Sequence, residues 1–326
     1  MLVLLTSLVV TVSLSPLVRA ALVRRGVLDV PNERSSHAIP VPRGGGIACL
    51  GGAMAGLILA DVLGYEVPWV AVTGALLLAG IGYLDDRFHL PPELRLGAQI
   101  VGGGLVGLAV GGADWVLLGA LVMPVLVNAV NFMDGINGIT SLNMAAWGGV
   151  AMLVGSTQGS SVLVAIGAAA AGSALGFLPW NAPKARLFLG DVGSYLFGAM
   201  IAIGIVAGAH DTSKAIILAA PLAIYLADTG TALVKRALRH ESLMTAHREH
   251  VYQRLVNDAG LSHIAVASGT VVLSLTITAA WVPGSIALGV GATVVVVSAY
   301  LAAPALLSRA GLSSGPREGG CSLTCG

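Results

Sequence analysis

Charged side chains are scarce in this sequence. Only 10% of its 326 residues are Asp, Glu, Lys or Arg, and the formal net charge is +1. The lack of excess positive charge excludes the electrostatic surface that a nucleic-acid partner requires. Hydrophobic residues reach 56% and the mean hydropathy is +0.88, beyond an ordinary soluble domain. At about 20 residues per membrane crossing, the composition predicts an all-α, polytopic integral membrane protein.

Cysteine is rarer still, with three residues in the chain. Cys49 lies in an apolar run, and we expect a small core residue there. Cys321 and Cys325 lie in a polar tail without a histidine or second cysteine pair to complete a zinc site. The first apolar run, residues 1–20, also lacks the basic residues that open a signal peptide, because Arg19 is the first basic residue. We therefore expect residues 1–20 to be a retained helix.

Short polar breaks divide the rest of the chain into apolar runs, which predict about 11 transmembrane helices in a single membrane-embedded domain, residues 1–308. Residues 309–326 are expected to be a disordered polar tail. With 44 glycines, close packing of these helices in lipid is expected. The predicted helices are 1–20, 45–63, 68–84, 96–110, 114–131, 139–155, 161–178, 193–209, 214–234, 263–281 and 284–307.

The connections between these helices alternate in charge. Successive loops along the chain form two alternating sets. Of the 17 lysines and arginines, only Lys214 falls in the second set. Lys and Arg are enriched in cytoplasmic loops, so we expect the first set to be cytoplasmic and the N-terminus to lie outside. The first set contains the loops 21–44, 85–95, 132–138, 179–192 and 235–262, together with the C-terminal tail.

Acidic residues from separate loops gather at these expected cytoplasmic ends: Asp85 with Asp86, Asp134, and Asp191. A carboxylate near hydrocarbon is costly unless a cation, hydrogen bonds or water neutralise it. Neighbouring side chains on a helix diverge by roughly 100°, so Asp85 and Asp86 are expected to have separate roles. Oxygen ligands without a cysteine or histidine cage favour Mg²⁺, with Mn²⁺ as an alternative.

Glycines flank two of the expected helix starts. "FLGDVGSYL" sets Gly190 and Gly193 around Asp191, and "PRGGG" places Arg43 before another helix. A helix N-terminus offers free N–H groups and a positive dipole end, which suits a phosphate. Tight packing or a turn is the other interpretation of each motif taken alone.

The longest expected cytoplasmic loop contains "AHREHVYQRL". His247 and His250 are three residues apart, hence on one face of a helix, with Arg248 between them. Such donors could hold a nucleotide diphosphate, or the segment could lie on anionic lipid headgroups. Asp228, about two turns from the end of the preceding helix, either faces the site or pairs with Lys235 or Arg236.

Five motifs together resemble the polyprenyl-phosphate N-acetylhexosamine-1-phosphate transferase superfamily, glycosyltransferase family 4. They are "DVPNERSSHAIPVPRGGG", "LDDRFHLPPELRLGAQ", "NAVNFMDGING", "PWNAPKARLFLGDVGS" and "AHREHVYQRL", and they span residues 29–254 in the family's order. The resemblance implies transfer of an N-acetylhexosamine 1-phosphate from a UDP-sugar to undecaprenyl phosphate, with release of UMP. It also implies a Mg²⁺-dependent enzyme of the bacterial plasma membrane.

The resemblance assigns roles to matching residues. Asp191 matches the metal-binding aspartate, and Asp85 is the group of the "DD" pair expected to act on the lipid phosphate. The catalytic residues implied are Asp85, Asp86 and Asp134, and the substrate-binding residues are Asn128, Asn131, Arg43, Arg95, His247, Arg248 and His250.

Three positions depart from the family pattern. Asn137 stands where the family often has a second aspartate, Arg95 replaces a frequent lysine, and "HREH" replaces three adjacent histidines. The last departure argues against the phospho-N-acetylmuramoyl-pentapeptide transferases, which stay as the alternative. The motifs look closer to the branch that initiates O-antigen or similar surface glycans, and the resemblance admits a homodimer. A secondary transporter is the remote alternative, although transporters place charges near the bilayer midplane.

Overall fold

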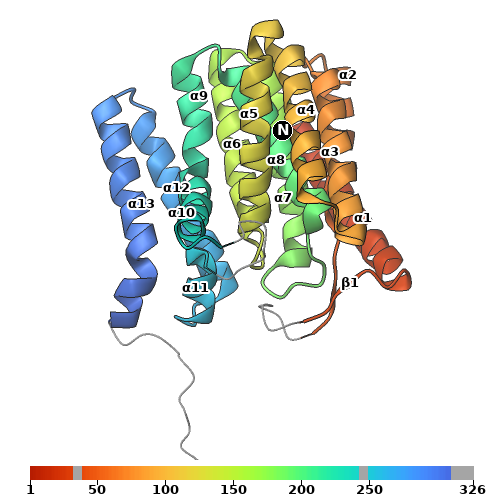
Figure 1. Cartoon of the computed structure of the whole chain (residues 1–326). Coiled ribbons are helices and arrows are strands. Elements are labelled where there is room, and N and C mark those ends of the chain that lie inside the picture. The colour runs from red at the N-terminus through yellow and green to blue at the C-terminus, as the bar shows by residue number, and fades with distance from the viewer. Residues whose placement is uncertain (32–38, 242–248, 310–326) are drawn as a thin grey trace, which may run out of the picture.

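The computed structural model describes residues 1–31, 39–241 and 249–309, and nearly all of its regular structure is helical (Figure 1). The helices are α1 Leu2–Arg24, α2 Gly46–Val62, α3 Trp69–Phe88, α4 Pro92–Gly111, α5 Val116–Met133, α6 Ile139–Gln158, α7 Ser161–Asn181, α8 Gly190–Gly208, α9 Thr212–Ala219, α10 Ala223–Leu238, α11 Val251–Asn257, α12 His263–Trp281 and α13 Ile286–Arg309. Two 3-10 turns, η1 Ala113–Trp115 and η2 Ala220–Leu222, and the short strands β1 Leu28–Asp29 and β2 Val41–Pro42 complete the elements.

The membrane-spanning segments agree with the sequence prediction. In the described part of the chain, ten helical segments are long and apolar enough to cross a membrane, and α2 is an eleventh apolar helix that is somewhat shorter. Each predicted segment coincides with one helix or one broken helix. The prediction of an all-α polytopic membrane protein is therefore confirmed.

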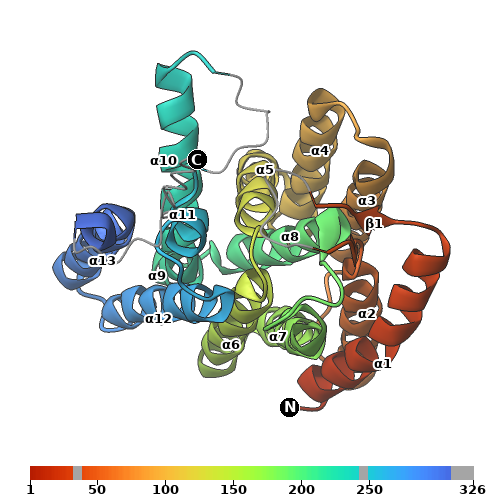
Figure 2. The ribbon, with the colours of Figure 1, turned by 90° about the horizontal axis from the view of Figure 1, so that it is seen from below.

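Helix α8 lies at the centre of the bundle, with α2 to α7 arranged around it (Figure 2). In its most apolar stretch 89% of the residues are buried, against 11% for α13 at the outer edge. Since Asp191 lies in the first turn of α8, this central position brings that carboxylate within reach of several other helices.

Close approach of the helices depends on glycine. A Cβ atom at Gly46 of α2 would collide with the backbone of Gly193 in α8, and one at Gly82 of α3 would collide with the carbonyl of Asp191. The prediction of glycine-mediated packing is confirmed at these contacts. The same contacts bring α2 and α3 against the first turn of α8.

The predicted single helix 214–234 is wrong, because the chain bends between α9 and α10. Pro221 lies in η2 at the bend, and proline cannot donate the backbone hydrogen bond that would continue a helix. Figure 1 shows α9 from the side and α10 along its axis, whereas Figure 2 shows α10 lengthwise. Helix α10 therefore runs outward from the bundle and lies beside α5 (Figure 2).

Two boundaries near the expected site also differ from the prediction. Helix α3 continues to Phe88, so Asp85 and Asp86 lie in its last turns and the predicted loop 85–95 shortens to the few residues before Pro92. The predicted loop 235–262 also contains a short helix, α11 Val251–Asn257, which the sequence did not predict as a separate element. The β1–β2 pair, α11 and the loop before α8 lie at one end of the bundle (Figure 1).

Candidate active site

The carboxylate of Asp86 caps the N-terminus of α8. Its two oxygens accept from the backbone N–H groups of Asp191, at 3.0 Å, and Val192, at 3.3 Å. These N–H groups have no partner within their own helix, and the positive end of the helix dipole favours an anion beside them. The sequence suggested a substrate phosphate at this helix start, but Asp86 already takes that position.

The glycines of "PRGGG" likewise serve packing. The N–H groups of Gly44 and Gly45 both donate to the carbonyl of Phe188, and that of Gly46 donates to the carbonyl of Leu189. The two glycine motifs therefore dock on one another, and the N–H groups of Gly44, Gly45 and Gly46 are already occupied and not available to a phosphate. Gly190 has φ +74°, a conformation that favours glycine, and a side chain there would press on Asp86.

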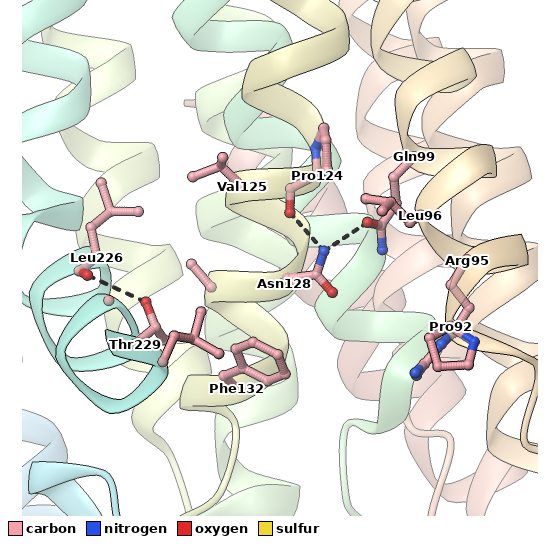
Figure 3. Close-up of a pocket in the computed structure, with 13 residues that line it drawn as sticks. Pro92, Arg95, Leu96, Gln99, Pro124, Val125, Asn128, Phe132, Leu226 and Thr229 are labelled. Atoms are coloured by element: carbon pink, nitrogen blue, oxygen red, sulfur yellow. Dashed lines mark hydrogen bonds between the residues drawn. The ribbon is translucent and has the colours of Figure 1, made fainter. Parts of the chain in front are cut away.

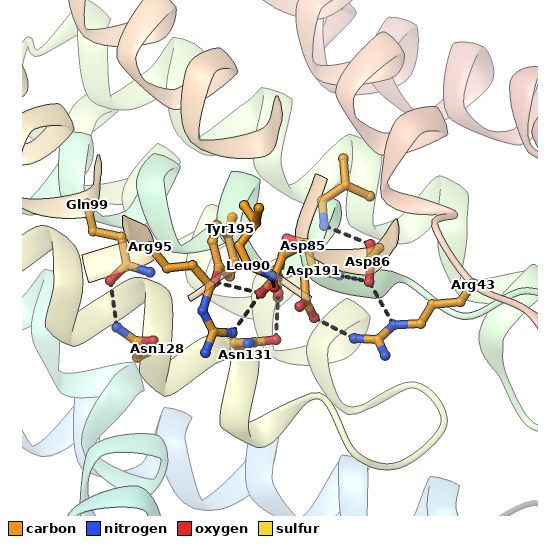
Figure 4. Close-up of polar contacts among 12 residues, drawn as sticks. Arg43, Asp85, Asp86, Leu90, Arg95, Gln99, Asn128, Asn131, Asp191 and Tyr195 are labelled. Carbon is orange, nitrogen blue, oxygen red and sulfur yellow. Dashed lines mark hydrogen bonds and ion pairs between the residues drawn. The ribbon is translucent and has the colours of Figure 1, made fainter. Parts of the chain in front are cut away.

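Docking of these motifs places Arg43 between two carboxylates (Figure 4). Its Nε lies 2.7 Å from Asp86 Oδ1 and its terminal NH2 lies 2.6 Å from Asp191 Oδ1. Burial lowers the pKa of the Arg43 guanidinium, but the charges of Asp191 and Asp86 outweigh this and raise the pKa above its ordinary value. Arg43 is therefore a permanent cation that joins α3 and α8.

Asp85 points to a different arginine from its neighbour. Its Oδ2 lies 2.6 Å from Arg95 NH1 of α4 and accepts from Tyr195 OH at 3.5 Å, and its Oδ1 accepts from the N–H of Leu90 at 2.8 Å. The predicted divergence of Asp85 and Asp86 is thus seen in the structure. Figure 4 shows the ion pairs of Arg43 and the ion pair of Arg95 side by side at the start of α8.

The signature "NAVNFMDG" ends α5 beside these ion pairs. Asn131 Oδ1 accepts from the hydroxyl of Ser194 on α8 at 3.0 Å. Asn128, one turn deeper, donates from Nδ2 to Gln99 Oε1 of α4 at 2.7 Å. The two asparagines therefore tie α5 to α8 and to α4.

Asp134 follows directly after α5 and has a perturbed acidity. Burial raises the pKa of its carboxyl to about 7, and the nearby charges of Asp191 and Asp86 add to this increase. Near neutral pH the Asp134 carboxyl can therefore either accept or release a proton. The charges of Arg43, Asp191 and Asp86 all act on the pKa of Asp134, so we group Asp134 with the ion pairs of Arg43 and Arg95.

Asn137 is held by hydrogen bonds from both its backbone and its side chain. Its backbone N–H donates to His263 Nδ1 at 3.1 Å, and its side-chain Nδ2 donates to the carbonyl of Pro183 at 3.0 Å. The neighbouring N–H of Gly138 donates to Asn181 Oδ1 at 2.6 Å. These bonds hold the turn after α5 against α7 and α12.

The histidine segment is described only in part. His247 and Arg248 lie outside the described residues, so the helical face predicted for His247 and His250 stays a prediction, and His250 directly precedes α11. His250 is buried, and its Nδ1 lies 3.1 Å from Asp228 Oδ1. The ring also lies near Phe132, with centroids 6.3 Å apart.

Asp228 has a defined place that the sequence left open. Besides His250, its carboxylate accepts from the backbone N–H groups of Val251 and Tyr252 and, at 2.7 Å, from Tyr300 OH of α13. Tyr252 OH in turn donates to the carbonyl of Phe132 at 2.9 Å. Asp228 therefore anchors the start of α11, and α11 supports the end of α5.

An apolar groove adjoins the ion pairs. Its volume is about 400 Å³, and its walls come from α4, α5 and α10 (Figure 3). Val125 and Leu96 on its walls are 55% and 41% exposed, so the groove opens on the outer, apolar surface of the bundle. Arg95 lines it as well, which connects the groove to Asp85.

The cluster has the composition of a site for a hard divalent cation. Four carboxylates against two guanidinium groups leave an excess of two negative charges when all are ionised. In the described residues no three acidic, histidine or cysteine side chains form a complete metal cage. Mg²⁺ needs only one or two carboxylates, since phosphate and water complete its shell. The residues therefore fit Mg²⁺ bound together with a phosphate substrate.

Three residues of this region were not assigned from the sequence. Tyr195 contacts Asp85, Gln99 contacts Asn128, and Asp228 holds the segment before α11. Gln99 follows Arg95 by four residues, a spacing that puts both on one helix face, so this signal was present. The roles of Tyr195 and Asp228 depend on contacts between distant segments, which no local pattern reveals.

Comparison with known proteins gives the same picture. The sequence model of glycosyl transferase family 4 matches residues 68–209. The chain is 29% identical to the decaprenyl-phosphate N-acetylglucosaminephosphotransferase of Mycolicibacterium smegmatis, over 90% of this chain and 85% of that protein. It is 28% identical to a probable undecaprenyl-phosphate N-acetylglucosaminyl 1-phosphate transferase of Bacillus subtilis, over 79% and 77%.

A third relative comes from the alternative branch. The phospho-N-acetylmuramoyl-pentapeptide-transferase of Mycobacterium ulcerans is 30% identical, over 61% of this chain and 70% of that protein. The chain therefore belongs to glycosyl transferase family 4, the superfamily of polyprenyl-phosphate N-acetylhexosamine-1-phosphate transferases.

Proposed function

We propose that this protein transfers N-acetylglucosamine 1-phosphate, or a deoxy derivative, from a UDP-sugar to a polyprenyl phosphate such as undecaprenyl phosphate. The observation that carries the proposal is the junction at Arg95, which lines the apolar groove and is ion-paired with Asp85 in the carboxylate cluster. A hydrocarbon chain suits the groove and a phosphate suits the cluster. A prenyl phosphate combines both.

The relatives favour N-acetylglucosamine. Two relatives that carry N-acetylglucosamine in their names match 90% and 79% of this chain, whereas the pentapeptide transferase relative matches 61%. We therefore place UDP-N-acetylmuramoyl-pentapeptide second among the donor substrates. The product, a polyprenyl-diphosphate-sugar, is the substrate for the first glycosyl transfer of a surface glycan, with O-antigen as one candidate.

The reaction is a phosphoryl exchange. An oxygen of the lipid phosphate attacks the β-phosphorus of the UDP-sugar, and the bond from that phosphorus to the oxygen bridging it to the α-phosphorus breaks. UMP leaves with the bridging oxygen, and the bond between C1 of the sugar and its phosphate oxygen stays intact. Because both substrates are anions, Arg43 and Arg95 reduce their repulsion, and Asp85 orients the lipid phosphate through Arg95.

We assign Mg²⁺ to Asp191, whose carboxylate would hold the ion. Bound there, Mg²⁺ would supply Lewis-acid neutralisation of phosphate charge. Asp86 keeps the start of α8 in place, and Arg43 holds Asp86 and Asp191 together. Asp134, with a pKa of about 7 raised by burial, is suited to hold or release a proton at the nucleotide side.

We propose that the site end of the bundle faces the cytoplasm. All but one of the lysines and arginines belong to loops assigned to that side, and basic residues mark the cytoplasmic side of a membrane protein. UDP-sugars are cytoplasmic metabolites, so the proposed donor is on the same side. The proposed location is the bacterial plasma membrane, with the N-terminus outside.

The test uses purified protein, undecaprenyl phosphate and a panel of UDP-sugars, with UMP release and the lipid product as readouts. We expect Mg²⁺-dependent UMP release from UDP-N-acetylglucosamine, strictly dependent on the lipid phosphate and abolished by a chelator. Asp61→Asn, in the exposed last turn of α2, is the matched control for a lost carboxylate. Lipid-dependent release from UDP-N-acetylmuramoyl-pentapeptide alone would assign the protein to the alternative function, and no release from any donor would refute transfer.

A further inference from the structure

Gln99 of α4 is an unusual residue for the groove that it lines. Its side chain is fully buried, and most of the groove walls around it are apolar. Its Oε1 accepts a hydrogen bond from Asn128, but its Nε2 has no acceptor in the described part of the chain. A buried amide N–H without a partner is costly, so this donor requires an explanation.

The orientation of the Gln99 amide is fixed by its neighbours. Asn128 Nδ2 donates both to the carbonyl of Pro124, at 2.8 Å, and to Gln99 Oε1, at 2.7 Å. A carbonyl oxygen can only accept, so it sets which end of the Asn128 amide faces α4. That amide end is a donor, so Gln99 must present its oxygen to it. The two N–H groups of the Gln99 amide therefore have no acceptor in the described part of the chain, and rotating either amide does not give them one.

The position of the leftover donor indicates its ligand. Gln99 and Arg95 are four residues apart and therefore share one face of α4, and both line the groove (Figure 3). Arg95 attracts an anion to the mouth of the groove, and Gln99 offers neutral N–H donors one turn deeper. A hydrocarbon chain has no acceptor for them, but a phosphate oxygen at the head of such a chain does.

We propose that Gln99, oriented by Asn128, donates a hydrogen bond to a phosphate oxygen of a prenyl phosphate monoester seated in the groove. Gln99 is thus a binding and specificity-determining residue for the lipid acceptor, distinguishing a prenyl phosphate from an uncharged prenol. The inference rests on the proposed function for the identity of the acceptor. The donor itself follows from the hydrogen bonds alone.

The experiment measures binding to the purified full-length protein in detergent. The probes are farnesyl phosphate, farnesol and inorganic phosphate. Gln99→Met keeps the length of the side chain and removes its N–H groups, and Leu96→Met, on the same groove wall, is the matched control. We expect Gln99→Met to weaken farnesyl phosphate binding about tenfold, the size expected for a hydrogen bond to a charged group, and to leave farnesol binding unchanged.

Two further variants and readouts keep the test decisive. Gln99→Glu places a carboxylate at the same site and should weaken farnesyl phosphate binding more than Gln99→Met. In transfer assays Gln99→Met should raise the KM for the lipid acceptor and leave the KM for the UDP-sugar unchanged, whereas a general loss of packing would change both. Thermal unfolding of each variant reports directly on its fold.

The outcomes separate this inference from the proposed function. Farnesyl phosphate binding that is equal in wild type and Gln99→Met overturns the role of Gln99, even if transfer occurs. Gln99-dependent binding without transfer from any UDP-sugar supports this inference and refutes only the proposed reaction. Inorganic phosphate that binds with the same Gln99 dependence and affinity as farnesyl phosphate would overturn the lipid as the source of the phosphate.

Discussion

At the start of α8, Asp86 and Asp191 share the guanidinium of Arg43, whereas at α10 Asp228 accepts hydrogen bonds from two backbone N–H groups, His250 and a tyrosine. The first cluster holds more carboxylates than cationic side chains and adjoins a groove. In the second cluster Asp228 is only 1% exposed, and hydrogen-bond donors surround both oxygens of its carboxylate.

The difference indicates what each cluster can do. A carboxylate whose oxygens are already saturated by donors from two segments, residues 250–252 and α13, stabilises the fold, because no acceptor capacity remains for a substrate. An excess of negative charge that the protein does not neutralise leaves room for an added cation and the phosphates that it carries. Substitutions in the two clusters should therefore have different signatures.

The largest effect is expected for Asp191→Asn. This change removes the proposed ligand charge for Mg²⁺ while the amide can still contact Arg43, so transfer should fall by about a thousandfold or more. The measurement is UMP release with a Mg²⁺ titration, together with thermal unfolding in detergent. Activity within tenfold of wild type at saturating Mg²⁺ would remove the metal from Asp191.

Asp85→Asn should reduce kcat by about a hundredfold, because the Asp85–Arg95 ion pair positions the lipid phosphate in the proposed reaction. Tyr195→Phe removes only the weaker contact to Asp85, at 3.5 Å, and should cost no more than a few-fold. The paired rates measured with saturating substrates test this order. Equal rates for the two variants would mean that Asp85 does not act through the arginine.

Asp228→Asn should have a smaller effect on transfer and a larger effect on stability. An amide presents two N–H groups where the structure needs only acceptors, so at least one donor among Val251, Tyr252 and Tyr300 loses its partner. We expect destabilisation of about 2 kcal/mol and about a tenfold lower kcat/KM, measured by thermal unfolding and UMP release. Tyr300→Phe removes one bond and should give a milder version of the same pattern.

How well the sequence anticipated each cluster follows from the range of the interactions. The membrane-spanning segments and the gathering of Asp85, Asp86 and Asp191 could be predicted, because hydrophobic length and loop charge are local properties. The partners of Asp228 could not, since Tyr300 lies 72 residues away on α13. The occupation of the α8 start by Asp86 was also out of reach, because it depends on two helices meeting at glycine contacts.

The bend at η2 falls between these cases. Pro221 was visible in the sequence, but a proline within an apolar run is compatible with a kinked membrane helix as well as a broken one. Helix α10 forms the third wall of the groove, alongside α4 and α5. The prediction of a single helix over 214–234 therefore concealed the groove, and with it the importance of Gln99.

The smallest effect is expected for stability at Asp134, and its sign depends on pH. Burial raises the pKa of this carboxyl from 3.8 to about 7, so ionisation disfavours the folded state. The penalty is absent below the unfolded pKa, grows as pH rises, and is complete above about 7. Asp134→Asn should therefore stabilise the protein increasingly between pH 5 and pH 8, on the order of 1 kcal/mol at the upper end after screening.

Thermal unfolding of wild type and Asp134→Asn across this range gives the measurement, with Asp114→Asn on the exposed turn η1 as the control for a lost carboxylate. The same variant should be impaired in transfer, because a neutral amide cannot hold or release the proton. A variant that is more stable and less active would show that the buried Asp134 carboxyl lowers the stability of the fold and is needed for transfer. A stability difference that is constant with pH would instead show that the carboxyl titrates normally, which would separate Asp134 from the charges at Asp191 and Asp86.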